Sequence, residues 1–144
     1  MDMQPRPHTV NSAIKALYLS LLISLISGLI NITKIANGSV YTDLPSNMPM
    51  HSFVLLLLAG LAFILLIQYA VIHFISRASN LARIIYLVCY LIGLVIFTTR
   101  FNEFMSAGLS YFIPAILNTL VRLFACYYMF NKEANPWFRS PKQA

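Results

Sequence analysis

Hydrophobic side chains gather in four long stretches of the chain, which polar segments separate. A helix of about 20 apolar residues is long enough to cross a hydrocarbon core of about 30 Å. Only three charged side chains fall within the stretches, and they are Lys15, Arg83 and Arg122. We expect Lys15 and Arg83, in the first turns, to reach the headgroups with their long side chains, whereas Arg122 lies deep. The predicted spans cover residues 13–30, 53–75, 81–99 and 107–130.

Apolar residues follow one another without interruption in these stretches, as in Leu55–Leu58 and Leu94–Phe97. The strands of a membrane barrel would alternate apolar and polar residues instead. Because a backbone in lipid must satisfy its own hydrogen bonds, each span is predicted to be a helix. The predicted fold class is therefore all-α, a polytopic membrane protein with four antiparallel transmembrane helices.

The segments between the spans predict how the helices are connected. In the polar segment at the N-terminus, Thr9, Asn11 or Ser12 can cap the first helix. The connections between the second, third and fourth spans are short, so these three helices are expected to pack as antiparallel neighbours. The predicted organisation is a cytoplasmic lead over residues 1–12, a four-helix transmembrane domain over residues 13–130 with an external loop at 31–52, and a cytoplasmic interfacial tail over residues 131–144.

Composition supports the membrane assignment and gives an orientation. The chain has 144 residues, of which 59% are apolar and 10% charged, whereas soluble domains carry about 25% charged residues. This shortage of charge argues against a nucleic-acid-binding protein, despite a net charge of +6. With both termini in the cytoplasm, Lys34 and Arg100 are the only basic residues outside, and such an excess of basic residues on the cytoplasmic side is typical of membrane proteins. The basic residues placed inside are Arg6, Lys15, Arg77, Arg83, Lys132, Arg139 and Lys142.

One face of the fourth span carries the deepest polar residues. Pro114, Asn118 and Arg122 recur every four residues and so share a helix face. An arginine at mid-membrane costs about 2.5–3.5 kcal/mol on insertion scales. Two interpretations remain open for Arg122: an anchor that extends to the inner headgroups, or a buried cation that recognises an anion, a lipid headgroup or a partner carboxylate. Neutral side chains at similar depth are expected to solvate the guanidinium in an intramembrane polar layer formed by Ser20, Gln68, Tyr90, Asn118 and Arg122.

A second candidate feature lies on the first span. Ser20, Ser24 and Gly28 are small residues at four-residue spacing, which allows two helix backbones to approach closely. We expect this face to pack inside the bundle, and a homodimer interface is the alternative.

Residue types that would support other chemistry are sparse. No Asp or Glu lies within a span, although ion-coupled exporters usually place a carboxylate there. The two cysteines, Cys89 and Cys126, form no Cys-x-x-Cys dithiol. The three histidines, His8, His51 and His73, lie apart and define no metal site. No nucleophile is paired with a base, so the prediction is a non-enzymatic protein without catalytic residues, metal ligands or cofactor.

The two flanks of the chain carry short motifs. Near the N-terminus Arg6-Pro7-His8-Thr9-Val10 is followed by Ala13 and by Leu17-Tyr18-Leu19-Ser20, and Trp137-Phe138-Arg139 stands near the C-terminus. With the four-span layout, these motifs resemble an uncharacterised family of small bacterial four-helix inner-membrane proteins, defined by Arg-Pro-x-x-Val at one end and a Trp-Phe-Arg tail at the other. The resemblance implies a bacterial inner membrane, and it supplies no active-site residues.

Taken together, these patterns predict a small integral membrane protein that acts by helix packing, as a structural, interaction or accessory subunit. The expected partners are the lipid bilayer and either a second copy or another membrane protein, and nucleic acid is not expected. The alternative is an oligomeric channel or transporter for an anionic solute, which would use the Asn118/Arg122 face.

Overall fold

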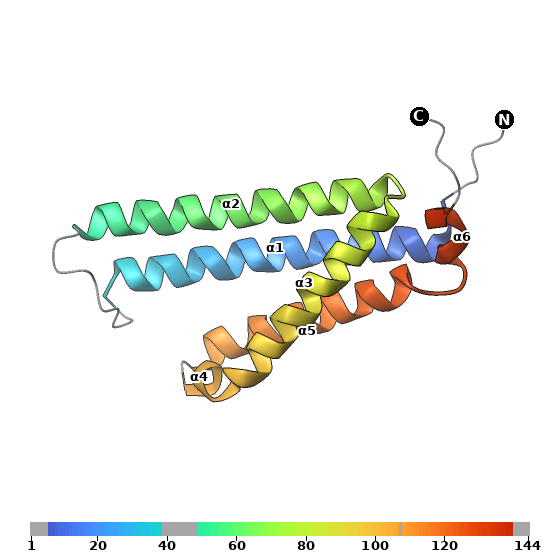
Figure 1. Cartoon of the computed structure of the whole chain (residues 1–144). Helices are drawn as coiled ribbons and strands as arrows, with labels where there is room; N and C mark the ends of the chain where they lie inside the picture. Colours follow the sequence, from blue (N-terminus) through green and yellow to red (C-terminus); the bar gives the residue numbers. More distant parts are fainter. Residues whose placement is uncertain (1–5, 39–48, 107, 140–144) are drawn as a thin grey trace.

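The computed structural model describes residues 6–38, 49–106 and 108–139, and within them every regular element is an α-helix (Figure 1). Four of these helices, α1, α2, α3 and α5, are long and apolar enough to cross a membrane. The predicted all-α fold with four antiparallel transmembrane helices is confirmed. The helices are α1 (His8–Ala36), α2 (Met50–Ser76), α3 (Asn80–Thr99), α4 (Phe101–Ser106), α5 (Leu109–Met129) and α6 (Ala134–Arg139).

The N-terminal lead is shorter than expected, because α1 begins at His8 rather than Ala13. Pro7 occupies the position before the helix with φ −57°, and no side chain caps it. The predicted capping by Thr9, Asn11 or Ser12 is therefore wrong. Thr9 lies inside the first turn and is buried. Proline is well suited to a helix start, because its φ is already helical and its missing N–H would have no partner there.

The connections also differ from the predicted boundaries. Helix α1 continues to Ala36 and α2 begins at Met50, so the expected external loop at 31–52 is helical at both ends, and its residues 39–48 lie outside the described residues. The connection after α3 contains the short helix α4, and Gly108 follows with φ 96°, a conformation that favours glycine. The expected tail contains helix α6.

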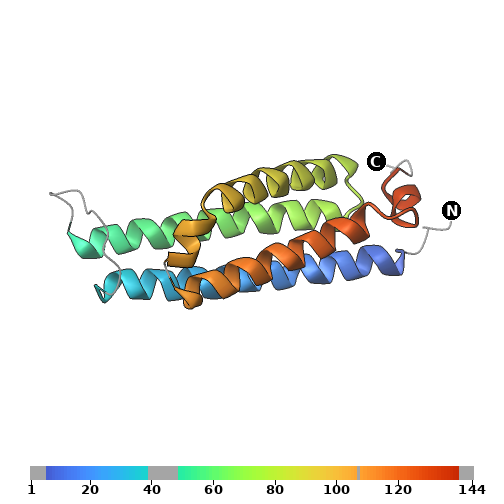
Figure 2. The same cartoon turned by 90° about the horizontal axis from the view of Figure 1, so that it is seen from below.

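Helix α1 is the centre of the packing. Its most extensive contacts are with α5 and α2, whereas α3 contacts α2 and α5 less extensively. Helices α1 and α2 lie side by side, and α3 diverges from α2 after their shared turn (Figure 1). Seen from below, α5 runs along α1 (Figure 2). The second, third and fourth spans, which were expected to pack as antiparallel neighbours, contact one another less extensively than the first span contacts the fourth.

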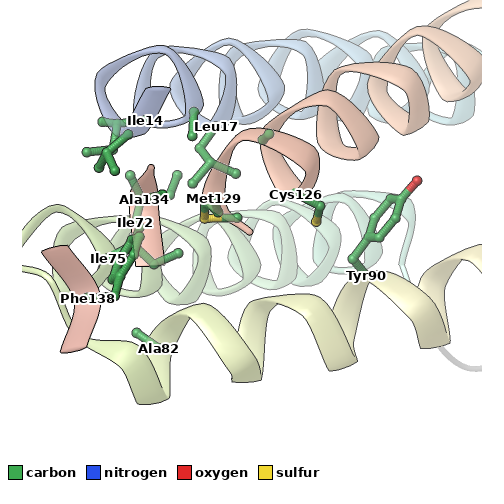
Figure 3. Close-up of a cluster of buried hydrophobic side chains, with 13 residues drawn as sticks. Ile14, Leu17, Ile72, Ile75, Ala82, Tyr90, Cys126, Met129, Ala134 and Phe138 are labelled. Atoms are coloured by element: carbon green, nitrogen blue, oxygen red, sulfur yellow. The ribbon is translucent and has the colours of Figure 1, made fainter. Parts of the chain in front are cut away.

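The buried core lies at the end of the bundle where α6 packs (Figure 3). Leu17 of α1, Ile75 of α2 and Met129 of α5 are among its largest fully buried side chains. Phe138 of α6 closes the same cluster. Most large apolar side chains elsewhere on the long helices are exposed, as expected for helices that face lipid.

Candidate functional site

Arg122 of α5 is held by two hydroxyl groups on α1. Its Nε donates a hydrogen bond to Ser20 Oγ at 2.8 Å, and its Nη2 donates to Ser24 Oγ at 3.2 Å. The guanidinium therefore bonds across to the neighbouring helix, and Arg122 is half-buried. This geometry does not match a side chain that extends along its own helix to the inner headgroups.

Asn118, one turn earlier on α5, completes the network. Ser20 Oγ donates to Asn118 Oδ1 at 2.6 Å, and Asn118 Nδ2 donates to Ser24 Oγ at 2.9 Å. Two pairs of residues at four-residue spacing, one on each helix, thus face each other and close a ring of four hydrogen bonds. We call this ring, formed by Ser20, Ser24, Asn118 and Arg122, the α1–α5 polar lock.

The positive charge of Arg122 has no acidic partner among the described residues. The three other members of the polar lock are neutral, and no Asp or Glu lies in α1, α2, α3 or α5. The structure assigns no hydrogen bond to Arg122 Nη1 within the described chain. Part of the hydrogen-bonding capacity of the guanidinium is therefore available to a further group.

Two cavities meet at Arg122. One, the α3–α5 cavity, has a volume of about 220 Å³, and Arg122, Asn118 and Tyr90 are among its lining residues. The other, the central cavity, has a volume of about 110 Å³ and includes Ser20, Gln68, Tyr90 and Arg122 in its wall. All five members of the expected polar layer thus line one cavity or both.

Tyr90 and Gln68 take part in this arrangement in different ways. The ring of Tyr90 extends from α3 (Figure 3), and its hydroxyl donates to the backbone oxygen of Thr119 at 3.3 Å. Gln68 of α2 lines the central cavity but makes no hydrogen bond within the described chain. The neutral groups bonded to Arg122 are therefore the two serines, whereas Tyr90 and Gln68 lie in the cavity walls.

The small-residue face of α1 lies inside one chain. Ser20 and Ser24 contact α5 through the polar lock. Gly28 faces α2, where a Cβ added to it would lie 2.6 Å from a methyl group of Leu61. Small side chains at these positions let α1 pack closely against both neighbours, so this face is not a free surface for a second copy.

Arg83 is a second buried cation, and its position corrects the expectation that it reaches the headgroups. Its side chain is 4% exposed, and its guanidinium carbon lies over the rings of Phe130 and Phe138, at 4.6 and 4.5 Å from their centroids. It donates to Met129 O at 3.1 Å, near the C-terminal end of α5, and to Asn135 Oδ1 at 2.9 Å on α6. It also donates to Asn80 Oδ1 at 2.7 Å.

These bonds join the start of α3 to the end of α5 and to α6. Sequence reasoning missed this role, because the partners of Arg83 lie about 50 residues away along the chain. The local signal was limited to Asn80, three residues earlier on the same helix face.

The two flanking motifs meet at the same end of the bundle. Arg6 Nη2 donates to the backbone oxygen of Ser76 at 2.8 Å, in the last turn of α2. The Arg6 guanidinium lies 5.6 Å from the centroid of the Trp137 ring, a cation–π contact. The first and last parts of the described chain thus form one structure over the turn between α2 and α3.

The thiols and histidines form no recognisable reactive site in the part of the chain that the structure describes. Cys89 is exposed and Cys126 is buried, and both are free. No group of three or more His, Cys, Asp or Glu side chains comes close enough to hold a metal ion within the described ranges.

The chain was compared with protein-family models, with curated proteins and with solved structures, and no match was found in any of the three. The functional interpretation therefore depends on the geometry of the chain itself.

Proposed function

We propose that this chain is a small accessory protein of the bacterial inner membrane, which acts by packing against another membrane protein and not by catalysis. The observation that carries the proposal is that the other helices of the chain bury some spans less than others. Over an apolar stretch of 18 residues in each span, 6% of the residues are buried in α2, compared with 11% in α5, 17% in α3 and 22% in α1. Helix α2 contacts α1 along one side and leaves a wide apolar surface, which includes Phe63 and Leu66, for a partner helix.

The α1–α5 polar lock supports the same proposal. Its four side chains bond to one another between α1 and α5, so this part of the interior serves the stability of the chain. An α1–α5 pair joined by this network leaves the exposed side of α2 available to a partner, because association in lipid depends on packing between preformed helices.

The proposed orientation places both termini in the cytoplasm. Arg6, Arg77 and Arg139 lie at the end of the bundle that carries α6, and Lys34 and Arg100 lie at the other end. Arg6, just before α1, contacts Trp137 of α6 at this end. The excess of basic residues at that end supports a cytoplasmic location for it.

Photo-crosslinking in native membranes tests the partner proposal. Phe63 on α2 is 64% exposed and Val95 on α3 is 61% exposed, so these two positions provide a matched comparison. A photoreactive amino acid at Phe63 is expected to give one discrete, protein-sized adduct, and the same residue at Val95 is expected to give lipid adducts. Lipid adducts alone at both positions would contradict an α2 interface.

A second candidate function is transport of an anionic solute, which the cavities beside Arg122 favour. Asn118 and Arg122 face α1 within a single chain, so a path through the centre of an oligomer formed by this face is disfavoured. Any anion handled by Arg122 would instead pass through the cavities of one chain. Anion flux into liposomes that disappears with Arg122→Gln would favour this function over the accessory role.

A further inference from the structure

We propose that the α3–α5 cavity binds an amphipathic carboxylate, such as a medium-chain fatty acid, with its carboxylate on Arg122. This inference goes beyond the proposed accessory role and does not depend on it. It rests on the position of a cation at one end of a cavity whose other end is apolar.

The polar end of the cavity is formed by Tyr90 of α3 and by Asn118, Thr119 and Arg122 of α5. Arg122 uses Nε and Nη2 in the polar lock, and Nη1 makes no hydrogen bond within the described chain. A carboxylate beside the guanidinium would receive a charge-assisted hydrogen bond, which is stronger than a bond between neutral groups. It would also neutralise a charge that no described acidic side chain neutralises.

The apolar end of the cavity lies about two helical turns away. Gly93, Leu94 and Phe97 line it from α3, and Ala115 lines it from α5. Seven residues separate Ala115 from Arg122, which corresponds to about 10 Å along a helix. An inorganic anion would leave this apolar wall without contact, whereas an alkyl chain would fill it.

Size and access also fit such a ligand. The cavity volume of about 220 Å³ exceeds the roughly 150 Å³ of an engineered apolar cavity that accommodates benzene. Gly93 and Ile96, which line the cavity, are also exposed on the surface of α3. A ligand dissolved in the bilayer can therefore enter from the side, and the end of its chain can remain in lipid.

Two variants test the polar end and the apolar end of the cavity separately. Arg122→Gln removes the charge. Gly93→Leu adds a bulky side chain at a residue that lines the apolar end and leaves Arg122 in place; a Cβ at Gly93 meets no atom within 4 Å, so the backbone tolerates the change. Gly60→Leu on α2 is the matched control, because its added Cβ also meets no atom within 4 Å and Gly60 does not line the cavity.

The experiment measures binding of radiolabelled octanoate to the full chain in phosphatidylcholine nanodiscs by equilibrium dialysis, with empty nanodiscs to correct for partition into lipid. The pH is kept high enough to ionise the acid. We expect saturable binding of one octanoate per chain, competition by unlabelled octanoate, and little competition by octanol or acetate. Arg122→Gln and Gly93→Leu are each expected to weaken binding about tenfold or more, which corresponds to about 1.4 kcal/mol, whereas Gly60→Leu is expected to bind as the natural sequence does.

Each other outcome would overturn the proposal. If octanol competes as well as unlabelled octanoate does, the cavity is an apolar pocket that does not recognise the carboxylate. If acetate or chloride competes equally well, the site binds small anions. Binding that does not saturate would show partition into lipid alone. If Arg122→Gln does not fold, Gly93→Leu decides the question, because unchanged octanoate binding by that variant would exclude the α3–α5 cavity.

Discussion

The α1–α5 polar lock predicts a large effect for a very small change, the removal of one oxygen atom in Ser20→Ala. Ser20 is 2% exposed, and its hydroxyl accepts from Arg122 Nε and donates to Asn118 Oδ1. The substitution breaks both bonds and leaves a guanidinium N–H and an amide oxygen without these partners in the membrane interior. Alanine itself fits the site, because it is smaller than serine.

The expected magnitude follows from the two broken bonds. Hydrogen bonds between transmembrane helices contribute about 0.6 kcal/mol each on average, so their simple loss would cost about 1 kcal/mol. Leaving a buried polar group without a partner raises the cost to about 1–3 kcal/mol. We therefore expect Ser20→Ala to lower the free energy of unfolding by about 1–3 kcal/mol.

Equilibrium unfolding in mixed micelles, with an increasing fraction of denaturing detergent, measures this free energy. Ser27→Ala is the matched control, because Ser27 lies on the same helix and makes no hydrogen bond within the described chain; its effect is expected to stay within about 0.5 kcal/mol. A double-mutant cycle with Asn118→Ala should give a coupling energy above about 0.5 kcal/mol. If Ser20→Ala unfolds at the same detergent fraction as Ser27→Ala, the polar lock does not stabilise the bundle.

Three further substitutions test other parts of the structure by the same unfolding measurement. Arg83→Met removes the bonds that join α3 to α5 and α6 and is expected to lower the free energy of unfolding by about 2–3 kcal/mol, whereas the exposed Arg77→Met should be nearly neutral. Equal stability of the two variants would contradict a joining role for Arg83. Gly28→Val places side-chain atoms against Leu61 and is expected to lower the free energy of unfolding by about 1–3 kcal/mol through overpacking. An unchanged free energy of unfolding would refute this close packing. Arg122→Leu leaves Ser20 and Ser24 bonded to Asn118, so its stability should stay within about 1 kcal/mol of the natural sequence, and a larger loss would show that the cation itself holds the bundle together.

The sequence was sufficient to predict the spans, because each depends on a property of a single segment. An uninterrupted apolar run has to be helical in lipid, whatever its neighbours are. The boundaries were less accurate at α1, where Thr9 and Val10 are buried against other helices. The helix begins directly after Pro7, a residue that favours a helix start, and the burial of Thr9 and Val10 stabilises the additional turn.

The helix face that carries the candidate site was predictable from the sequence, but its bonding was not. Four-residue spacing correctly placed Asn118 and Arg122 on one face. The pairing of that face with Ser20 and Ser24 depends on which helices pack together, and the structure pairs the first span with the fourth. Arg83 shows the same limit, because the partners that hold it away from the headgroups come from α5 and α6.

The most direct test of the central claim, four membrane crossings with the α6 end in the cytoplasm, is thiol labelling of intact cells. Cys89 and Cys126 are first replaced by alanine, and single cysteines are then placed at the exposed positions Asn37, Arg77 and Lys132. A membrane-impermeant maleimide is predicted to label Asn37→Cys in intact cells, and Arg77→Cys and Lys132→Cys only after the membrane is opened. Labelling of Arg77→Cys and Lys132→Cys from opposite sides, or of all three positions in intact cells, would contradict the account.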